Sequence, residues 1–135
     1  MNKIILESIP HHEQRYDTVG DWYFTPGTNY LVIRVSDMGN WKYETLIAIH
    51  ELVEVTLCAS GKITQEVVDK FDLAYDGDGE PGDAPGCPYA GPHCVATGVE
   101  RILAAIMGVT WHKYEEAIAN LPDWKAHNKA MLHGG

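Results

Sequence analysis

The pattern of apolar and polar residues changes near residue 40 and divides the chain into two parts. Before that point, the run KIILESI and the two runs on either side of TPGTN have the composition of short strands and turns. They predict one strand that ends before Pro10 and a hairpin from about Trp22 to Ser36. After residue 40, apolar residues recur every three or four positions, which is typical of helices that bury one face.

Residues 40–121 are expected to form about four helices. Asn40 has the side chain of a helix N-cap, and its helix is expected to run to about Ser60, with Gly61 as the C′ residue. The other three helices are expected over residues 65–75, 93–107 and 111–121. Residues 76–92 are rich in Gly, Pro and Asp, so we expect a long loop that forms a lid or a cleft wall.

These elements predict a single α+β domain, in which a small N-terminal antiparallel sheet is followed by about four helices. The strand-rich part covers residues 1–38, the helical part covers residues 40–121, and a tail of residues 122–135 is expected to form at most a short helix. The length of 135 residues is that of one ordinary domain, which can bury a core without disulfides.

The net charge of −9 narrows the set of partners. Nucleic acids and anionic membranes are bound mainly through clusters of Lys and Arg, and the sequence contains no such cluster. No apolar run has the length of a transmembrane helix, and the first ten residues lack the pattern of a signal peptide. Three cysteines without a CxxC pair favour a reducing compartment. We therefore expect a cytoplasmic protein that binds neither nucleic acid nor membrane.

The candidate site begins with three polar residues at the centre of the most apolar helix. In the stretch LIAIHELVEVTL, His50, Glu51 and Glu54 interrupt a largely apolar run. Because this helix is apolar almost all round, we expect it to be buried, and a buried carboxylate must be paired, neutralised or bound to a metal. His50 and Glu54 lie one turn apart and project to a common point, which is the geometry of two metal ligands.

The helix predicted over residues 93–107 supplies complementary side chains. His93 and Glu100 fall on one face of it, two turns apart, and their neighbours on that face are small enough for another helix to approach. Of the cysteines, Cys87 is the one placed to reach a metal, whereas Cys94 is expected to be a buried thiol that points away from His93.

Apart from glutamates that are exposed at a cleft, this pattern leaves two interpretations of the polar centre. The first is one divalent ion, preferably zinc, with ligands drawn from His50, Glu54, His93 and Glu100. In that case Glu100 either binds the ion or holds a ligand imidazole in place. The second interpretation is an ion-pair network in which an Arg, such as Arg34 or Arg101, or a His from elsewhere in the chain reaches the buried carboxylates.

The segment AIHELVE resembles the zinc-binding helix of the zincin metallopeptidases, whose pattern is HExxH on a helix that follows an edge strand. The likeness covers this helix and the strand before it, about a fifth of the chain. Glu54 stands where zincins carry their second His, so His50, Glu54 and His93 would give the two-His, one-Glu ligand set of one zincin subclass in a different order. The resemblance implies that Glu51 is the general base.

The sequence thus predicts a metal-dependent hydrolase that acts on a small-molecule or peptide substrate, with a metal-activated water and Glu51 as general base. The whole chain also looks like small uncharacterised proteins of phage and prophage genomes, which would place it in the host cytoplasm and implies no reaction.

Two other functions fit parts of the sequence. The spacing of Glu51, Glu54, Glu66 and Asp69 resembles that of the MazG-like nucleotide pyrophosphohydrolases, in which such carboxylates hold Mg²⁺. A non-enzymatic binding protein with a structural metal or a buried ion-pair network is the other alternative.

Overall fold

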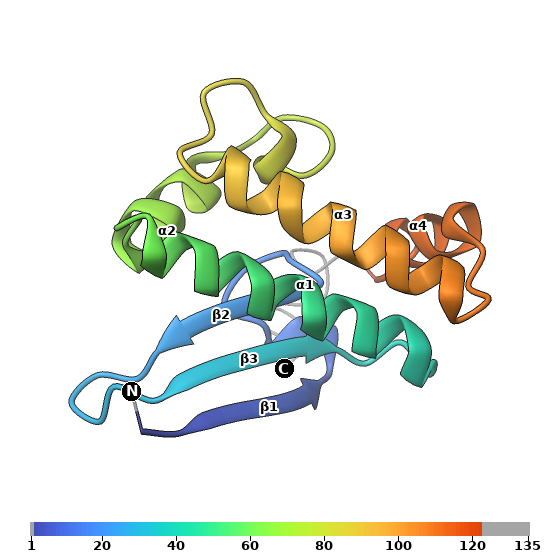
Figure 1. Cartoon of the computed structure of the whole chain (residues 1–135), viewed down its shortest axis with the longest axis horizontal. Coiled ribbons are helices and arrows are strands. Elements are labelled where there is room, and N and C mark those ends of the chain that lie inside the picture. The colour runs from blue at the N-terminus through green and yellow to red at the C-terminus, as the bar shows by residue number, and fades with distance from the viewer. Residues whose placement is uncertain (1, 123–135) are drawn as a thin grey trace, which may run out of the picture.

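The structure is a computed structural model of the chain and describes residues 2–122. In this part, three strands precede four α-helices (Figure 1). The strands are β1 (Ile4–Ile9), β2 (Gly20–Phe24) and β3 (Leu31–Ser36). The helices are α1 (Trp41–Ser60), α2 (Gln65–Ala74), α3 (Ala90–Ile106) and α4 (Trp111–Ala119). The predicted α+β class is confirmed, whereas the short helix predicted in the tail falls almost wholly outside the described residues.

The three strands form one mixed sheet in the order β1-β3-β2. The predicted hairpin is present, because β2 pairs antiparallel with β3 from Gly20–Val35 to Phe24–Leu31. The prediction of a wholly antiparallel sheet is wrong, since β1 pairs with β3 in parallel. The reason is the connection of residues 10–19, which carries the chain past β3 so that β1 and β2 lie on opposite sides of it.

Helix α1 lies between the sheet and α3, and contacts both (Figure 1). One side of α1 therefore packs on the apolar sheet residues, whereas the other faces α3, which runs in the opposite direction. The core contains Trp22 and Ile33 from the sheet, Leu46 and Val55 from α1, and Tyr114 from α4. Polar residues on α1 consequently have protein on both sides, which makes their partners decisive for stability.

The burial of α1 is less complete than the sequence predicts. Leu52 is 41% exposed and lies on a solvent-facing side of the helix. The prediction of burial almost all round is therefore wrong on this side, because neither the sheet nor α3 reaches it. The helix remains buried at the positions that matter for the site, which are His50, Glu51 and Glu54.

The ends of α1 follow the predicted capping with one change. The side chain of Asn40 accepts hydrogen bonds from the backbone N–H groups of Lys42 and Tyr43. At the other end, Gly61 has φ −88° and Lys62 has φ +60°, so the left-handed residue that follows the helix is Lys62. The left-handed residue therefore lies one position after Gly61, the residue predicted for C′.

The loop between α2 and α3 is shorter than predicted because α3 begins at Ala90 instead of residue 93. Pro92 lies in the first turn of α3, where its missing N–H group would have no helical partner in any case. A 3-10 turn, η2 (Pro81–Asp83), lies within the remaining loop and packs against α3. None of the helices within residues 2–122 has both the length and the hydrophobicity needed to cross a membrane.

Candidate metal centre

Four of the predicted site residues meet between α1 and α3. His50 and Glu54 extend from α1, and His93 and Glu100 extend from α3. Each of the four is between 5% and 8% exposed. Because the two helices run in opposite directions, His50 lies beside Glu100 and Glu54 lies beside His93.

Three of these residues converge on one point. One ligand atom from each of His50, Glu54 and His93 lies within 4.8 Å of the other two. His50 Nε2 is 3.2 Å from Glu54 Oε2, and His93 Nδ1 is 3.3 Å from the same oxygen. Two ligands of a tetrahedral zinc ion with bonds of about 2.0 Å are about 3.3 Å apart, so the two spacings suit such an ion.

Glu100 lies outside this converging group. Its Oε1 accepts a hydrogen bond from His50 Nδ1 at 2.7 Å, on the side of the imidazole ring opposite Nε2. Its Oε2 accepts a short hydrogen bond from the hydroxyl of Tyr114, which is fully buried. Of the two roles expected for Glu100, the structure therefore places it as the group that orients the His50 ring and not beside the converging ligand atoms.

The arginines of the ion-pair interpretation lie elsewhere. Arg34 Nε is 2.7 Å from Glu7 Oε1, and Arg101 approaches Glu115 at 3.9 Å. Within residues 2–122, the basic groups that touch Glu54 are the two histidines. The indole N–H of Trp22 also donates to Glu54 Oε1 at 3.2 Å, so both oxygens of this buried carboxylate are satisfied.

Without a metal, the cluster is held by charge pairs. Burial would lower the pKa of His50, but hydrogen bonds to Glu100 and Glu54 outweigh burial and raise this pKa to about 11. Burial would likewise raise the pKa of Glu54, but hydrogen bonds from His50 and His93 lower it to about 2. A divalent cation at this point would take the place of the positive charge that the histidines supply.

Glu51 lies beside this cluster and differs from its neighbours. It is 9% exposed, and no hydrogen bond to its carboxylate occurs within the described part of the chain. Gly20 makes room for it, because a Cβ atom at Gly20 would lie 2.7 Å from Glu51 Oε1. Burial, followed by the charge of Glu54, raises the pKa of Glu51 well above its usual value.

The cluster lies at the bottom of a cleft of about 740 Å³. His50, Glu51, Glu54 and His93 all line it, so a small molecule in the cleft can reach them. The opposite walls come from the connection before β2, from α2 and from residues 75–82. The prediction that the Gly- and Pro-rich loop forms a cleft wall agrees with this arrangement.

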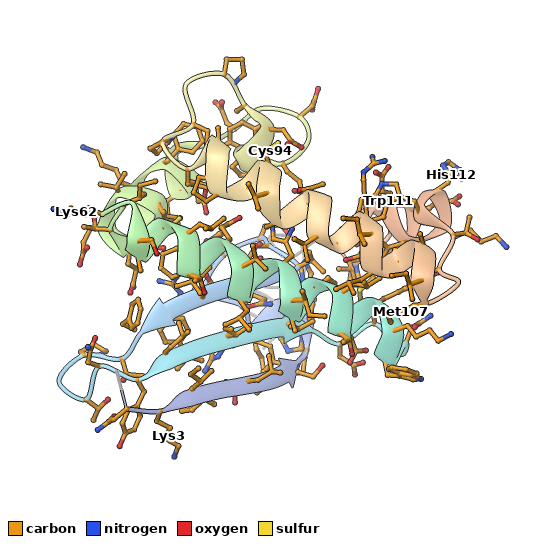
Figure 2. All side chains as sticks on the ribbon, in the orientation of Figure 1. Lys3, Lys62, Cys94, Met107, Trp111 and His112 are labelled. Atoms are coloured by element: carbon orange, nitrogen blue, oxygen red, sulfur yellow. The ribbon has the colours of Figure 1, made fainter. Side chains whose placement is uncertain are left out.

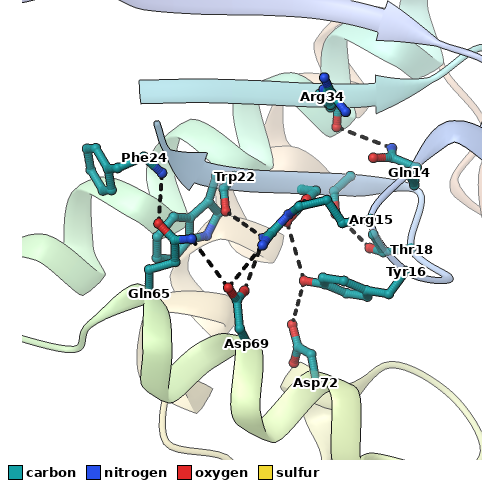
Figure 3. A network of polar contacts seen from close by, with 12 residues as sticks. Gln14, Arg15, Tyr16, Thr18, Trp22, Phe24, Arg34, Gln65, Asp69 and Asp72 are labelled. Atoms are coloured by element: carbon teal, nitrogen blue, oxygen red, sulfur yellow. Dashed lines mark hydrogen bonds and ion pairs between the residues drawn. The ribbon is translucent and has the colours of Figure 1, made fainter. Parts of the chain in front are cut away.

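A polar network joins the wall formed by residues 10–19 to α2 (Figure 3). Arg15 binds Asp21 with Nε at 2.7 Å and Nη2 at 2.9 Å, and it contacts Asp69 on α2 at 3.0 and 3.1 Å. Tyr16 donates to Asp72, one turn further along α2, at 3.0 Å (Figure 3). These contacts join two parts of the cleft lining, the connection of residues 10–19 and α2.

The four carboxylates that resemble the Mg²⁺ site of the MazG-like pyrophosphohydrolases are not brought together. Asp69 is engaged by Arg15, and Glu66 is exposed on α2. Neither residue lines the cleft or belongs to a group within residues 2–122 that could hold a metal ion. The ExxE spacing therefore places Glu51 and Glu54 in the site, whereas Asp69 pairs with Arg15 and Glu66 is exposed.

The cysteines stay outside the centre. Cys87 is buried but belongs to no group of converging ligands among the described residues. Cys94 is exposed on the outside of α3, as Figure 2 shows, so the prediction of a buried thiol is wrong. Cys94 is exposed because α3 is rotated so that the preceding residue, His93, faces inward.

Several residues of the centre were not found from the sequence. They are Trp22 and Tyr114, which donate to Glu54 and Glu100, and Glu80 and Asp83, whose carboxylates lie near His93. The one available signal was chemical, because a buried carboxylate needs donors and a buried indole or phenol needs an acceptor.

Comparisons with known protein families, curated proteins and solved structures find no match to this chain.

Proposed function

We propose that this protein is a metal-dependent hydrolase that binds one divalent ion, preferably zinc, through His50, Glu54 and His93. The observation that carries the proposal is the convergence of these three ligand atoms at the floor of an accessible cleft. Structural zinc sites are closed by four protein ligands, whereas catalytic sites use three and leave one position open. Three converging residues beside a cleft fit the second type.

The donor set also fits zinc in its chemistry. Two imidazoles and one carboxylate are a ligand combination of catalytic zinc sites, and each ligand here has a further partner that orients it. Glu100 holds the Nδ1 side of His50, and Trp22 holds the second oxygen of Glu54. When bound, zinc lowers the pKa of a water molecule in its open position to about 7.

Glu51 is the general base of the proposed reaction. It follows the ligand His50 directly, lines the same cleft, and its carboxylate has no hydrogen-bond donor within residues 2–122. A carboxylate that is buried and free on the cleft side can accept a proton from a water at the floor and transfer it to a leaving group. Gly20 sets its position, because no side chain there pushes Glu51 away.

The charge of the cleft favours neutral or cationic substrates. Carboxylates from several elements line the cleft, including those of Asp17, Asp21, Glu51, Asp72, Asp76 and Glu80. Arg15 is the single Lys or Arg among the described lining residues, and it is already paired with Asp21 and Asp69. An anionic nucleotide would meet repulsion here, so peptides and small neutral or basic amides and esters suit the cleft better.

Metal analysis combined with turnover tests this function. Protein purified without chelator or affinity metal is expected to carry about one zinc per chain, and His50→Ala and Glu54→Ala are expected to lose it. A panel of neutral and basic amide and ester substrates is then assayed before and after chelation. Bound zinc without any turnover would favour a structural metal in a binding protein, and no zinc at all would return the cluster to an ion-pair network.

A further inference from the structure

His93 touches two groups of carboxylates, one at each ring nitrogen. Its Nδ1 faces Glu54, whereas its Nε2 lies 3.3 Å from Glu80 Oε2 and 3.2 Å from Asp83 Oδ1. Glu80 and Asp83 belong to the loop between α2 and α3, so the ring joins this loop to the centre between α1 and α3. A neutral imidazole has one acceptor nitrogen and one N–H donor, so the two sides of the ring cannot play the same role.

The same loop also covers the face of the ring. Gly82, between the two acidic residues, is buried, and a Cβ atom added to it would lie 2.4 Å from Cγ and Nδ1 of His93. No side chain can occupy that space without displacing the ring. Contact on one face and carboxylates at one edge together leave the His93 ring little freedom to rotate.

From these contacts we propose that the Glu80–Asp83 turn is a positioning element that fixes His93 as a metal ligand through Nδ1, with the carboxylates of Glu80 and Asp83 facing its protonated Nε2 as ion-pair partners. The inference rests on the proposed function, because it assigns a role at the same metal centre. The other imidazole has a carboxylate partner too. Glu100 accepts a hydrogen bond from His50 Nδ1 and so leaves Nε2 for the ion. Each ligand imidazole would then be oriented by a carboxylate.

The consequence is that metal affinity depends on a loop that supplies none of the three proposed ligands, although Glu80 and Asp83 also converge with His93 as a second group that could hold an ion. Removing carboxylate partners of this kind usually costs 10–100-fold in metal affinity. The double variant Glu80→Gln/Asp83→Asn is therefore expected to bind zinc 10–100-fold more weakly. Gly82→Ala is expected to do the same by displacing the ring. Since Glu80 and Asp83 have side chains 54% and 72% exposed, the metal-free double variant is expected to fold normally.

The controls change charge or size without touching His93. Asp78→Asn removes one carboxylate from the same loop, and Asp78 belongs to no group near the ring. Gly91→Ala adds a methyl group in the first turn of α3, where nothing lies within 4 Å of it. Both are expected to keep the zinc affinity of the wild-type protein.

The test is chelator competition for zinc near neutral pH, combined with ¹⁵N NMR of the imidazoles in the zinc-bound protein. We expect His93 to bind through Nδ1 and to keep a proton on Nε2, and the loop variants to weaken binding as stated. Equal affinity in the loop variants and their controls, or zinc bound through Nε2 of His93, would overturn this inference. If the wild-type protein binds no zinc, or binds zinc equally well without His50 and Glu54, the proposed function itself is overturned.

Discussion

Glu51 and its neighbour His50 show how one position along a helix can separate two roles. His50 faces α3 and the other proposed ligands, whereas Glu51 is turned toward Gly20 at the start of β2. Glu51→Gln keeps the size of the side chain and removes its basicity. We expect the variant to bind zinc normally and to lose roughly 10²–10⁴-fold in turnover, which is the usual contribution of a general base. Parallel metal analysis and kinetics check this, and loss of zinc would make Glu51 a ligand instead.

Gly20 allows a second test of the same role without changing a polar group. A methyl group at this position would lie 2.7 Å from Glu51 Oε1 and from Ile47 Cγ2, so one of them must move. Because misplacing a catalytic group by about 1 Å can cost roughly 10²-fold, we expect Gly20→Ala to lower kcat by about that factor with zinc retained. Gly98→Ala, where an added Cβ has nothing within 4 Å, is the matched control and is expected to keep full activity.

Asp72 predicts a dependence of stability on pH. Burial raises its pKa, hydrogen bonds from Tyr89 and Tyr16 partly offset this, and the resulting pKa is about 6. The unfolded carboxyl titrates near pH 3.9, so between about pH 4 and 6 the folded chain keeps a proton that the unfolded chain has lost. The free energy of unfolding, relative to that of Asp72→Asn, is therefore expected to be highest below about pH 4 and to fall until about pH 6.

Urea unfolding of both proteins with excess chelator, from about pH 4 to pH 7.5, measures this difference. The comparison with Asp72→Asn cancels the other titrating groups, because they are shared. Parallel stability profiles for the two proteins would show that Asp72 titrates normally in the fold and would contradict the prediction.

The residues that were predicted from the sequence share one property, which is a spacing within a single helix. His50 and Glu54, at i and i+4, and His93 and Glu100, at i and i+7, had to share a face of their helix once that helix was assigned. Trp22 lies 32 residues from Glu54 in the chain, and nothing in the local pattern of either residue indicates their contact. Which side of an imidazole a carboxylate approaches, as for Glu100, is likewise decided by the packing of two helices.

At the scale of elements, Arg15 and Tyr16 connect residues 10–19 to α2. Arg15 pairs with Asp21, which is 2% exposed, and with Asp69 on α2 (Figure 3). Arg15→Met would leave the buried Asp21 without its cation, so we expect a loss of about 2–4 kcal/mol in the free energy of unfolding. Arg34→Met is the control, because Arg34 packs on the same Tyr23 ring but pairs with Glu7, whose side chain is 40% exposed.

The control is expected to lose only about 0–1 kcal/mol, as is usual for an exposed pair. Chemical denaturation of both variants gives the comparison. Equal losses would mean that Arg15 stabilises the fold by packing on Tyr23 and not by pairing with Asp21.

The elements themselves were largely predictable, and the exceptions have local physical reasons. Asn40 marked a helix start correctly because a cap is a property of a few neighbouring positions. The parallel pairing of β1 with β3 was not predictable, since strand order depends on where a ten-residue connection crosses the sheet. The same order makes β3 a central strand, so the edge strand implied by the zincin resemblance is not present before α1.

At the scale of the whole molecule, the proposed ion would connect helix α1 with helix α3. His50 and Glu54 come from α1, whereas His93 comes from α3, and the two segments are separated by α2 and a long loop. An ion that binds all three binds the folded chain far better than the unfolded one, so binding must raise stability. At free zinc about 100-fold above the Kd, the gain is about 2.7 kcal/mol.

For a chain of this length, that gain corresponds to a rise in Tm of roughly 8–13 °C. We expect thermal unfolding of chelated wild-type protein to show this rise when zinc is restored. His93→Ala is expected to show almost none of it, since two ligands hold zinc poorly. Glu100→Gln is expected to show an intermediate rise, because it weakens the orientation of His50 without removing a ligand.

The control for this experiment is another histidine of the same chain. His112 on α4 has a side chain 86% exposed, and its nearest carboxylate, that of Glu116, is 3.9 Å away. His112→Ala removes an imidazole that could bind zinc nonspecifically, and it is expected to keep the full rise in Tm. If His93→Ala also kept the full rise, zinc would stabilise the protein at some other place, and α1 and α3 would be held together by the His–Glu pairs alone.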